Sequence, residues 1–204
     1  MKATILFSFI SLLLLQHCAG KGPLLSNTAD SLNAKKILIV YLTRTKNTEA
    51  VAEMIHQRVK GDMVALELLH PYPENYQQHV DQVAEENRSG YLPPLKTVID
   101  SIRQYDVVFI GFPTWGMQLP PPLKTFLTQY NLSGKTIVPF NTNAGYGVGS
   151  GFETIKKLCP GSIVLKGFSV EGGKEKEGIL FVMQGNKEIQ VRTEVNNWLQ
   201  SIQF

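Results

Sequence analysis

The sequence predicts an α/β fold in which helices cover both faces of a five-stranded parallel sheet. Apolar segments of strand length alternate with segments of helical periodicity from residue 36 onward. Residues 107–112 and 137–140 are nearly continuous apolar runs, which is typical of strands covered on both faces. This alternation favours parallel strands joined by right-handed helical crossovers.

Each element is placed by its apolar pattern. A charged, glycine-rich loop at residues 171–178 precedes 179–182, a candidate for a short extra strand. The final helix is amphipathic, and its spacing makes Trp198 a core anchor. The expected strands are residues 36–42, 63–69, 106–112, 135–140 and 162–168, and the expected helices are residues 47–59, 75–88, 95–104, 121–130, 150–159 and 187–202.

The first twenty residues are predicted to be a secretory signal that is not part of the fold. Lys2 gives a basic start, residues 5–15 are apolar apart from two serines, and small residues at 18–20 follow. This apolar core is too short to span a membrane. The chain therefore divides into a signal peptide at 1–20, a polar tether at 21–35 and a folded domain at 36–204.

Two processing routes fit this N-terminal segment. Leu15-Gln16-His17-Cys18 resembles a bacterial lipobox with Cys18 as a candidate lipid anchor, although His17 replaces the small residue expected there. Ordinary cleavage after Gly20 is the alternative. By either route we expect an exported protein, in the periplasm or anchored by lipid at the bacterial cell envelope.

Composition excludes several classes of function. The formal net charge of +3 is too small and too scattered for a nucleic-acid-binding protein. The four histidines lack the spacing of metal ligands. Cys159 is the one cysteine left after cleavage past Gly20, so no intrachain disulfide forms, and its position before Pro160 favours a buried thiol. No side chain stands out as a covalent catalyst.

The loop after the first expected strand has the composition of a phosphate cradle. It has the sequence Thr43-Arg44-Thr45-Lys46-Asn47-Thr48 and leads into a helical pattern. Loop amides and the helix N-terminus supply donors and partial positive charge, and three threonines add hydroxyl groups. The loop lacks the glycine spacing of dinucleotide and nucleoside-triphosphate sites, which favours a monophosphate. The alternative is an ordinary threonine-rich helix cap.

Two further loops should meet this one, because the carboxyl ends of parallel strands share one edge of the sheet. Residues 113–120 contain Trp115, and residues 141–147 are rich in glycine and amide side chains. A phosphate cradle, an aromatic slab and an amide-lined loop together describe a site for flavin mononucleotide (FMN). The alternative for Trp115 is packing within its own domain.

Residues 41–52, 111–127 and 132–149 resemble the three signature segments of the flavodoxin family, most closely a bacterial branch with a Pro-x-Trp loop. The resemblance extends from about residue 36 to the end of the chain. It implies a flavodoxin-like three-layer sandwich with strand order 2-1-3-4-5 and FMN as the cofactor.

The resemblance also implies roles for individual positions. The first loop would hold the FMN phosphate, and the other two would flank the isoalloxazine ring. The implied contacts are Thr43, Arg44, Thr45, Asn47 and Thr48 to the phosphate, Pro113, Thr114, Trp115 and Gly116 beside the ring, and Asn141, Thr142, Asn143, Gly145, Tyr146 and Gly147 on its far side.

Three positions depart from the family pattern. Lys46 stands where the family loop usually has glycine, which costs roughly 1 kcal/mol in left-handed backbone geometry. Its charge would offset that cost by attraction to the phosphate, or the replacement marks a loop that has lost FMN. Gly116 stands where the branch commonly has a second tryptophan, and Asn143 where related proteins often have histidine.

We expect FMN-dependent redox chemistry, either one-electron transfer or the two-electron reduction of a quinone-type acceptor, with donor and acceptor unidentified. No Asp or Glu occurs in residues 107–152, which contribute Lys124 and Lys135 instead. A less negative setting eases the addition of a second electron, which favours a two-electron, quinone-reductase-like oxidoreductase. The alternative is a flavin-free binding module of the envelope with the same fold.

Overall fold

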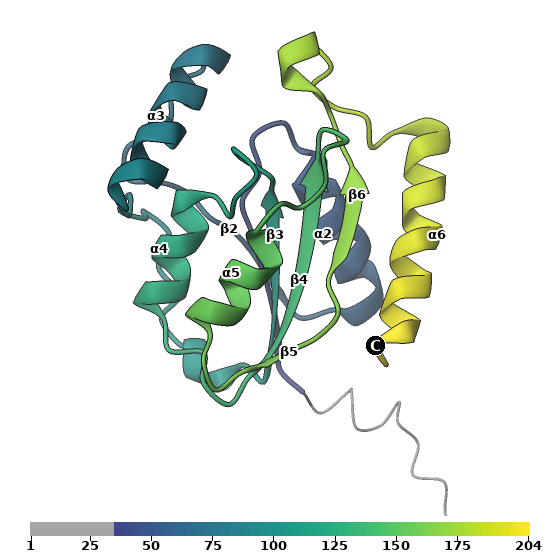
Figure 1. Cartoon of the computed structure of the whole chain (residues 1–204). Coiled ribbons are helices and arrows are strands. Elements are labelled where there is room, and N and C mark those ends of the chain that lie inside the picture. Colours follow the sequence, from purple (N-terminus) through teal and green to yellow (C-terminus); the bar gives the residue numbers. More distant parts are fainter. Residues whose placement is uncertain (1–34) are drawn as a thin grey trace, which may run out of the picture.

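A parallel sheet forms the middle layer of the fold (Figure 1). The computed structural model describes residues 35–204, so the predicted signal peptide and nearly all of the tether lie outside it. The strand order β2-β1-β3-β4-β5 confirms the flavodoxin-like topology expected from the sequence. The strands are β1 (Ile37–Tyr41), β2 (Asp62–Ala65), β3 (Val107–Pro113), β4 (Thr136–Asn143), β5 (Ile163–Val164) and β6 (Phe168–Glu171).

Helices cover both faces of this sheet. Figure 1 shows α2 and α6 on one face and α4 and α5 on the other, with α3 beside α4 and projecting beyond the edge of the sheet. Among the described helices, none is long and apolar enough to cross a membrane. The helices are α2 (Asn47–Val59), α3 (Tyr76–Ser89), α4 (Pro121–Gln129), α5 (Gly151–Leu158) and α6 (Gly185–Ser201), with single 3-10 turns η1 (Ile102–Gln104) and η2 (Glu175–Glu177).

The central strands are buried on both faces, which is why they read as continuous apolar runs. Every residue of β1 is buried, and Phe109 of β3 is fully buried in the cluster under α2 and α6. Trp198 of α6 lies in the same cluster and donates from Nε1 to the Lys166 carbonyl at 2.9 Å, which confirms its role as a core anchor. Cys159 is buried under the other face, and burial raises the pKa of its thiol to about 11.

The strand expected at 162–168 is wrong in its extent, because it is split into β5 and β6. Both pieces pair in parallel with β4, β5 near its start and β6 at its carboxyl end. Gly167 lies in the break, where a Cβ atom would meet the Phe152 ring at 2.5 Å. The prediction of an extra strand at 179–182 is also wrong, since only an isolated bridge joins Ile179 to Lys174. The split lets β6 carry the chain on to the carboxyl edge.

The helix expected at 95–104 is wrong as well, apart from the single turn η1. Leu95 forms an antiparallel bridge with Leu68, so this segment lies along the chain that leaves β2. The Thr97 hydroxyl donates to the Ala65 carbonyl at 3.0 Å and accepts from the Glu67 amide at 2.7 Å. These bonds give hydrogen-bond partners to the backbone that leaves β2. The segment therefore stays extended along that backbone and does not form the helix that its apolar periodicity predicts.

Candidate functional site

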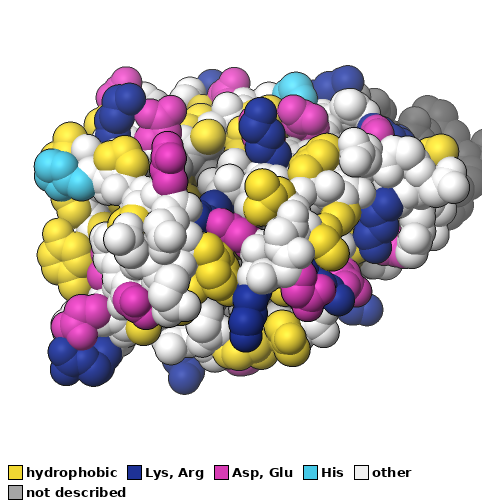
Figure 2. Space-filling model, turned by 90° about the horizontal axis from the view of Figure 1, so that it is seen from above, with side chains coloured by type: hydrophobic (Ala, Val, Ile, Leu, Met, Phe, Trp, Pro, Cys, Tyr) yellow, Lys and Arg dark blue, Asp and Glu magenta, His cyan; other side chains and the backbone are white. Residues whose placement is uncertain are grey.

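A cavity of about 450 Å³ lies at the carboxyl edge of the sheet. Figure 2 looks onto this edge and shows apolar side chains interleaved with acidic and basic ones. The carboxyl ends of β3 and β4 and the loops after β1, β3 and β4 form one side of the cavity, and α3, the loop after β6 and η2 supply the rest. The residues expected at the site that line it are Arg44, Thr45, Asn47, Pro113, Thr114, Trp115, Gly116, Thr142 and Asn143. Those that do not line it are Thr43, Lys46, Thr48, Asn141, Gly145, Tyr146 and Gly147.

The loop after β1 keeps free donors where a phosphate cradle needs them. The Thr43 hydroxyl is buried, and no partner for it lies among the described residues. The Thr45 hydroxyl accepts a 2.8 Å bond from the Asn47 amide, which leaves its own proton free to donate. The first amides of α2 have no intrahelical acceptor, as at any helix start. This concentration of donors fits an anion.

Lys46 adopts the backbone conformation that the family's glycine would provide. It caps α2 with φ of 63° and ψ of 0°, in the left-handed region, and its side chain makes no capping bond. A side chain in this region carries a steric penalty that glycine avoids. The loop therefore keeps the geometry of the family pattern in spite of the substitution.

The side chains of Asn47 and Thr48 build the loop. Asn47 is buried, donates to the Leu180 carbonyl at 2.6 Å and accepts from the Val182 amide at 3.1 Å. The buried Thr48 hydroxyl lies 2.9 Å from that of Thr142 on β4. These bonds tie the start of α2 to residues 180–182 and to β4. A phosphate contact from Asn47 or Thr48 stays a prediction, and their backbone amides remain available for it.

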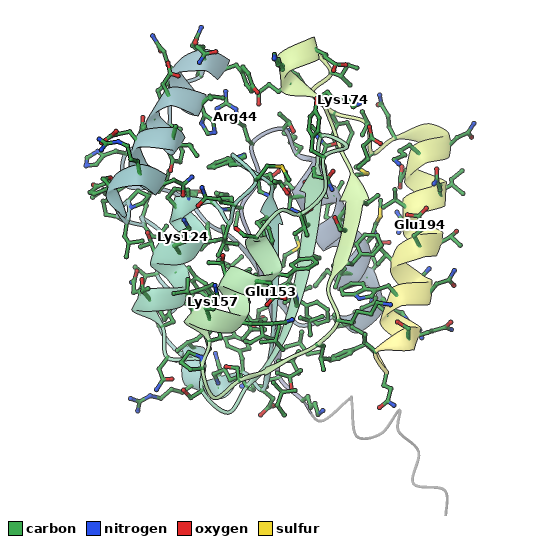
Figure 3. The ribbon with its side chains drawn as sticks, viewed as in Figure 1. Arg44, Lys124, Glu153, Lys157, Lys174 and Glu194 are labelled. Carbon is green, nitrogen blue, oxygen red and sulfur yellow. The ribbon has the colours of Figure 1, made fainter. Side chains whose placement is uncertain are left out.

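The Arg44 side chain joins three segments across the top of the cavity (Figure 3). Its guanidinium is paired with Glu175 of η2 at 2.8 Å. It also donates to the Pro73 carbonyl at 3.1 Å, to the Glu74 carbonyl at 2.7 Å and to Nδ1 of His79 at 3.3 Å. These contacts occupy the side chain that the family resemblance assigns to phosphate, so that role also stays a prediction.

An aromatic cluster holds Trp115. The ring of His79 lies edge-on to Trp115 with centroids 4.4 Å apart, and Tyr72 lies edge-on to both rings. His79 is buried, and its Nε2 has no partner among the described residues. Burial, with the neighbouring Arg44 charge as a second cause, lowers the pKa of His79 from 6.5 to about 4. The imidazole is therefore neutral near pH 7. A lone histidine in the sequence gave no signal of this role.

A second hollow of about 480 Å³ lies against the same cluster. It shares Arg44, His79 and Trp115 with the main cavity, and Thr43 lines it as well. The loop after β1 and the aromatic cluster thus form the partition between two spaces.

The carboxyl ends of β3 and β4 and the loops that follow them are locked to each other by their own polar groups, and β4 extends to Asn143 where the sequence predicted a loop from residue 141. The Asn141 amide donates to the Phe112 carbonyl at 3.0 Å and to the Thr114 hydroxyl at 2.9 Å, and that hydroxyl donates to the Gly147 carbonyl at 2.9 Å. Asn143 Oδ1 accepts from the backbone amide of Gly147 at 3.0 Å. The amide side chains of this segment therefore hold the backbone in place through hydrogen bonds within the protein. Tyr146 takes no part in this network and is exposed.

Charge at the site differs from the expectation based on residues 107–152. Lys135 precedes β4 and donates to the Arg103 carbonyl at 3.3 Å, so it lies at the opposite edge of the sheet. Two carboxylates from outside that span reach the site instead. Glu175 lines the cavity, whereas Glu171 lies just outside it, where one of its oxygens would be 3.3 Å from a Cβ atom at Gly145. Glu171 is paired with Lys174 at 3.1 Å, as Glu175 is with Arg44, so these pairs bring little net charge.

Comparison with known proteins agrees with this arrangement. The family model described as Flavodoxin matches residues 36–184. A candidate flavoprotein from Bacteroides eggerthii DSM 20697 is similar at TM-score 0.66 and 26% identity, covering 83% of this chain and 99% of its own. A flavoprotein in complex with FMN from Lactobacillus acidophilus NCFM is similar at TM-score 0.59 and 23% identity, covering 67% of this chain and 93% of its own. No curated protein matches the chain.

Replacing Lys46 tests the strained start of α2. We expect Lys46→Gly to be more stable than Lys46→Ala by about 1 kcal/mol, because both variants remove the charge and only glycine relieves the left-handed strain. Urea denaturation of the two variants measures the difference. Equal stabilities would show that Lys46 is not strained.

Acid denaturation tests the buried imidazole. The unfolded chain takes up a proton at His79 near pH 6.5, whereas the folded protein resists it down to about pH 4. The contribution to stability is therefore complete above about pH 6.5 and is lost as the pH falls towards 4, by up to about 1.4 kcal/mol per pH unit. We expect this slope to be smaller in His79→Gln and unchanged in His70→Gln, since His70 is exposed. Identical slopes in all three proteins would contradict the account.

Proposed function

The chain belongs to the flavodoxin family, and from this premise we propose that the cavity at the carboxyl edge binds FMN and that the protein is a redox flavoprotein. One observation carries the proposal. The orphaned Thr43 hydroxyl, the unpaired amides at the start of α2 and the held ring of Trp115 all meet at one edge of the sheet. The similarity to a Lactobacillus acidophilus flavoprotein in complex with FMN supports the choice of ligand.

The residues at this edge fit the parts of FMN. The Thr43 and Thr45 hydroxyls and the backbone amides of residues 43–49 would hold the phosphate at the positive end of α2. Lys46 would add attraction that weakens with salt. Trp115 and the two interlocked loops would flank the ring, in a cavity of about 450 Å³, within the usual size range for a ligand site. The bound flavin would supply the redox chemistry, and the chain would supply binding, orientation and charge.

We propose two-electron reduction of a quinone-type acceptor in preference to one-electron transfer. Glu175 lines the cavity and Glu171 lies just outside it, and each of these carboxylates is paired with a cation. A site without net negative charge opposes the arrival of a second electron less. One-electron transfer remains the second candidate, because Gly116 has φ of 56° and open space around it, and its peptide can reorient beside the ring.

We also propose export to the cell envelope. The support is the order of basic, apolar and small residues at 1–20, which lies outside the described part of the chain. The described chain enters β1 at the amino end of the strands, at the opposite edge from the cavity (Figure 1), so a tether there would leave the cavity accessible. Mass spectrometry of the native protein should find a chain that begins at Cys18 with lipid or near Lys21, and an intact Met1 would contradict export.

Flavin titration tests the proposed cofactor. We expect the purified protein to quench FMN fluorescence on binding, and Trp115→Ala to weaken binding by about 1–3 kcal/mol, the range for stacking on a flat ring. Tyr91→Ala removes an exposed aromatic ring away from the cavity and should leave the affinity unchanged. A protein that folds and does not bind FMN would support the flavin-free binding module instead.

Redox titration of the FMN-loaded protein tests the number of electrons. We expect both electrons to enter in a single spectroscopic step, and Lys174→Gln, which unpairs Glu171, to lower the potential of that step. Two well-separated one-electron steps in the unmodified protein would reject the two-electron proposal and favour an electron carrier.

A further inference from the structure

One face of α3 is an apolar wall of the cavity that the flavin loops do not account for. Val80, Val83 and Ala84 line the cavity from α3, and their spacing of three and four residues places them on one side of the helix. Val80 is 36% exposed, and Ala84 is also exposed, although both face the cavity. The protein therefore leaves Val80 and Ala84 uncovered beside the cavity, whereas Val83 between them is buried.

The wall ends in two amide side chains that face the cavity, Asn87 of α3 and Gln118 of the loop after β3. Lys124 donates from Nζ to Asn87 Oδ1 at 2.7 Å and approaches Gln118 Oε1 at 3.5 Å. Both amide oxygens are thus directed to the lysine, which leaves Asn87 Nδ2 and Gln118 Nε2 as donors. Within residues 35–204, neither nitrogen has an acceptor within hydrogen-bonding distance.

Lys124 is a half-buried cation, and within residues 35–204 its amine is held by these two amides alone. Figure 3 shows it on α4, below α3. No carboxylate is paired with it in the described part of the chain, and burial lowers the pKa of its amine. Because its charge attracts the amide oxygens, Lys124 fixes which way both amides point. It acts as a positioning residue and does not itself line the cavity.

We propose that this end of the cavity is the acceptor subsite, in which a planar apolar ring lies on Val80, Val83 and Ala84 while its carbonyl oxygen accepts hydrogen bonds from Asn87 and Gln118. The inference rests on the proposed function of the same cavity. A quinone has both features, an apolar ring and a carbonyl oxygen at its edge. A phosphate-bearing nicotinamide acceptor fits less well, because Arg44 and Arg88, which line the cavity, are paired with Glu175 and Glu85.

A pair of matched ligands and a pair of matched variants test this subsite. The ligands are 2-methyl-1,4-naphthoquinone and 2-methylnaphthalene, which has the same ring system without the carbonyl oxygens. They are titrated by ligand-observed NMR into the oxidised FMN-loaded protein, where no turnover occurs. Asn87→Asp keeps an oxygen for Lys124 and replaces the donor with an acceptor. Asn131→Asp makes the same change of charge on an exposed loop away from the cavity.

We expect Asn87→Asp to weaken quinone binding roughly tenfold, the effect of a lost hydrogen bond and a misplaced oxygen, and to leave 2-methylnaphthalene binding unchanged. Val80→Asp should weaken both ligands, and Asn131→Asp neither. If FMN binds normally and quinone binding is the same in Asn87→Asp, the subsite is overturned and the cofactor proposal stands. If Asn87→Asp weakens FMN itself and the quinone does not bind, α3 covers the flavin and the inference is wrong. Failure of the unmodified protein to bind FMN would overturn the proposed function first.

Discussion

The side chain of Arg44 holds the outer walls of the cavity together. The sheet fixes the loops after β1, β3 and β4, whereas α3 and η2 extend beyond its edge (Figure 1). Arg44 leaves the first of these loops and contacts His79 of α3 and the Pro73 and Glu74 carbonyls just before α3 on one side, and Glu175 of η2 on the other. Its side chain is 17% exposed, so the ion pair is screened less than a surface pair would be. Arg44 is therefore the side chain that links η2 to the segment leading into α3, while α3 is also held by the His79 contact with Trp115 and by the Lys124–Asn87 bond.

Several side chains that the sequence predicts to contact FMN instead form hydrogen bonds within the protein that shape the site. Asn47 joins the start of α2 to residues 180–182, and Asn141 joins the end of β4 to the end of β3 and the loop after it. Buried amides must be satisfied, and each finds its partners within the protein. In the described part of the loop after β1, the free donors are the Thr43 and Thr45 hydroxyls and the backbone amides at the start of α2. An anion that binds there meets a loop that is already in place, which lowers the entropic cost of binding.

The sequence was informative where burial on both faces determined the pattern. β1, β3 and the first part of β4 could be predicted because each is a nearly continuous apolar run, whereas the polar residues Asn141–Asn143 extend β4 into the segment expected to be loop. The loops after these strands follow from the shared edge of a parallel sheet. Long-range contacts decided the rest. Residues 95–104 have helical periodicity, but hydrogen bonds to the Glu67 and Ala65 carbonyls keep the start of this segment extended. Neither the Arg44–Glu175 pair, across 131 positions, nor the burial of His79 has a local signal.

A crystal structure of the FMN-loaded protein would test the central claim most directly. The account predicts the phosphate at the first turn of α2 beside Thr43 and Thr45, the ring in the cavity next to Trp115, and the Arg44 guanidinium still on Glu175 and the Pro73 and Glu74 carbonyls. An Arg44 side chain turned onto the phosphate, with α3 and η2 no longer joined, would contradict the account, as would FMN bound outside this cavity.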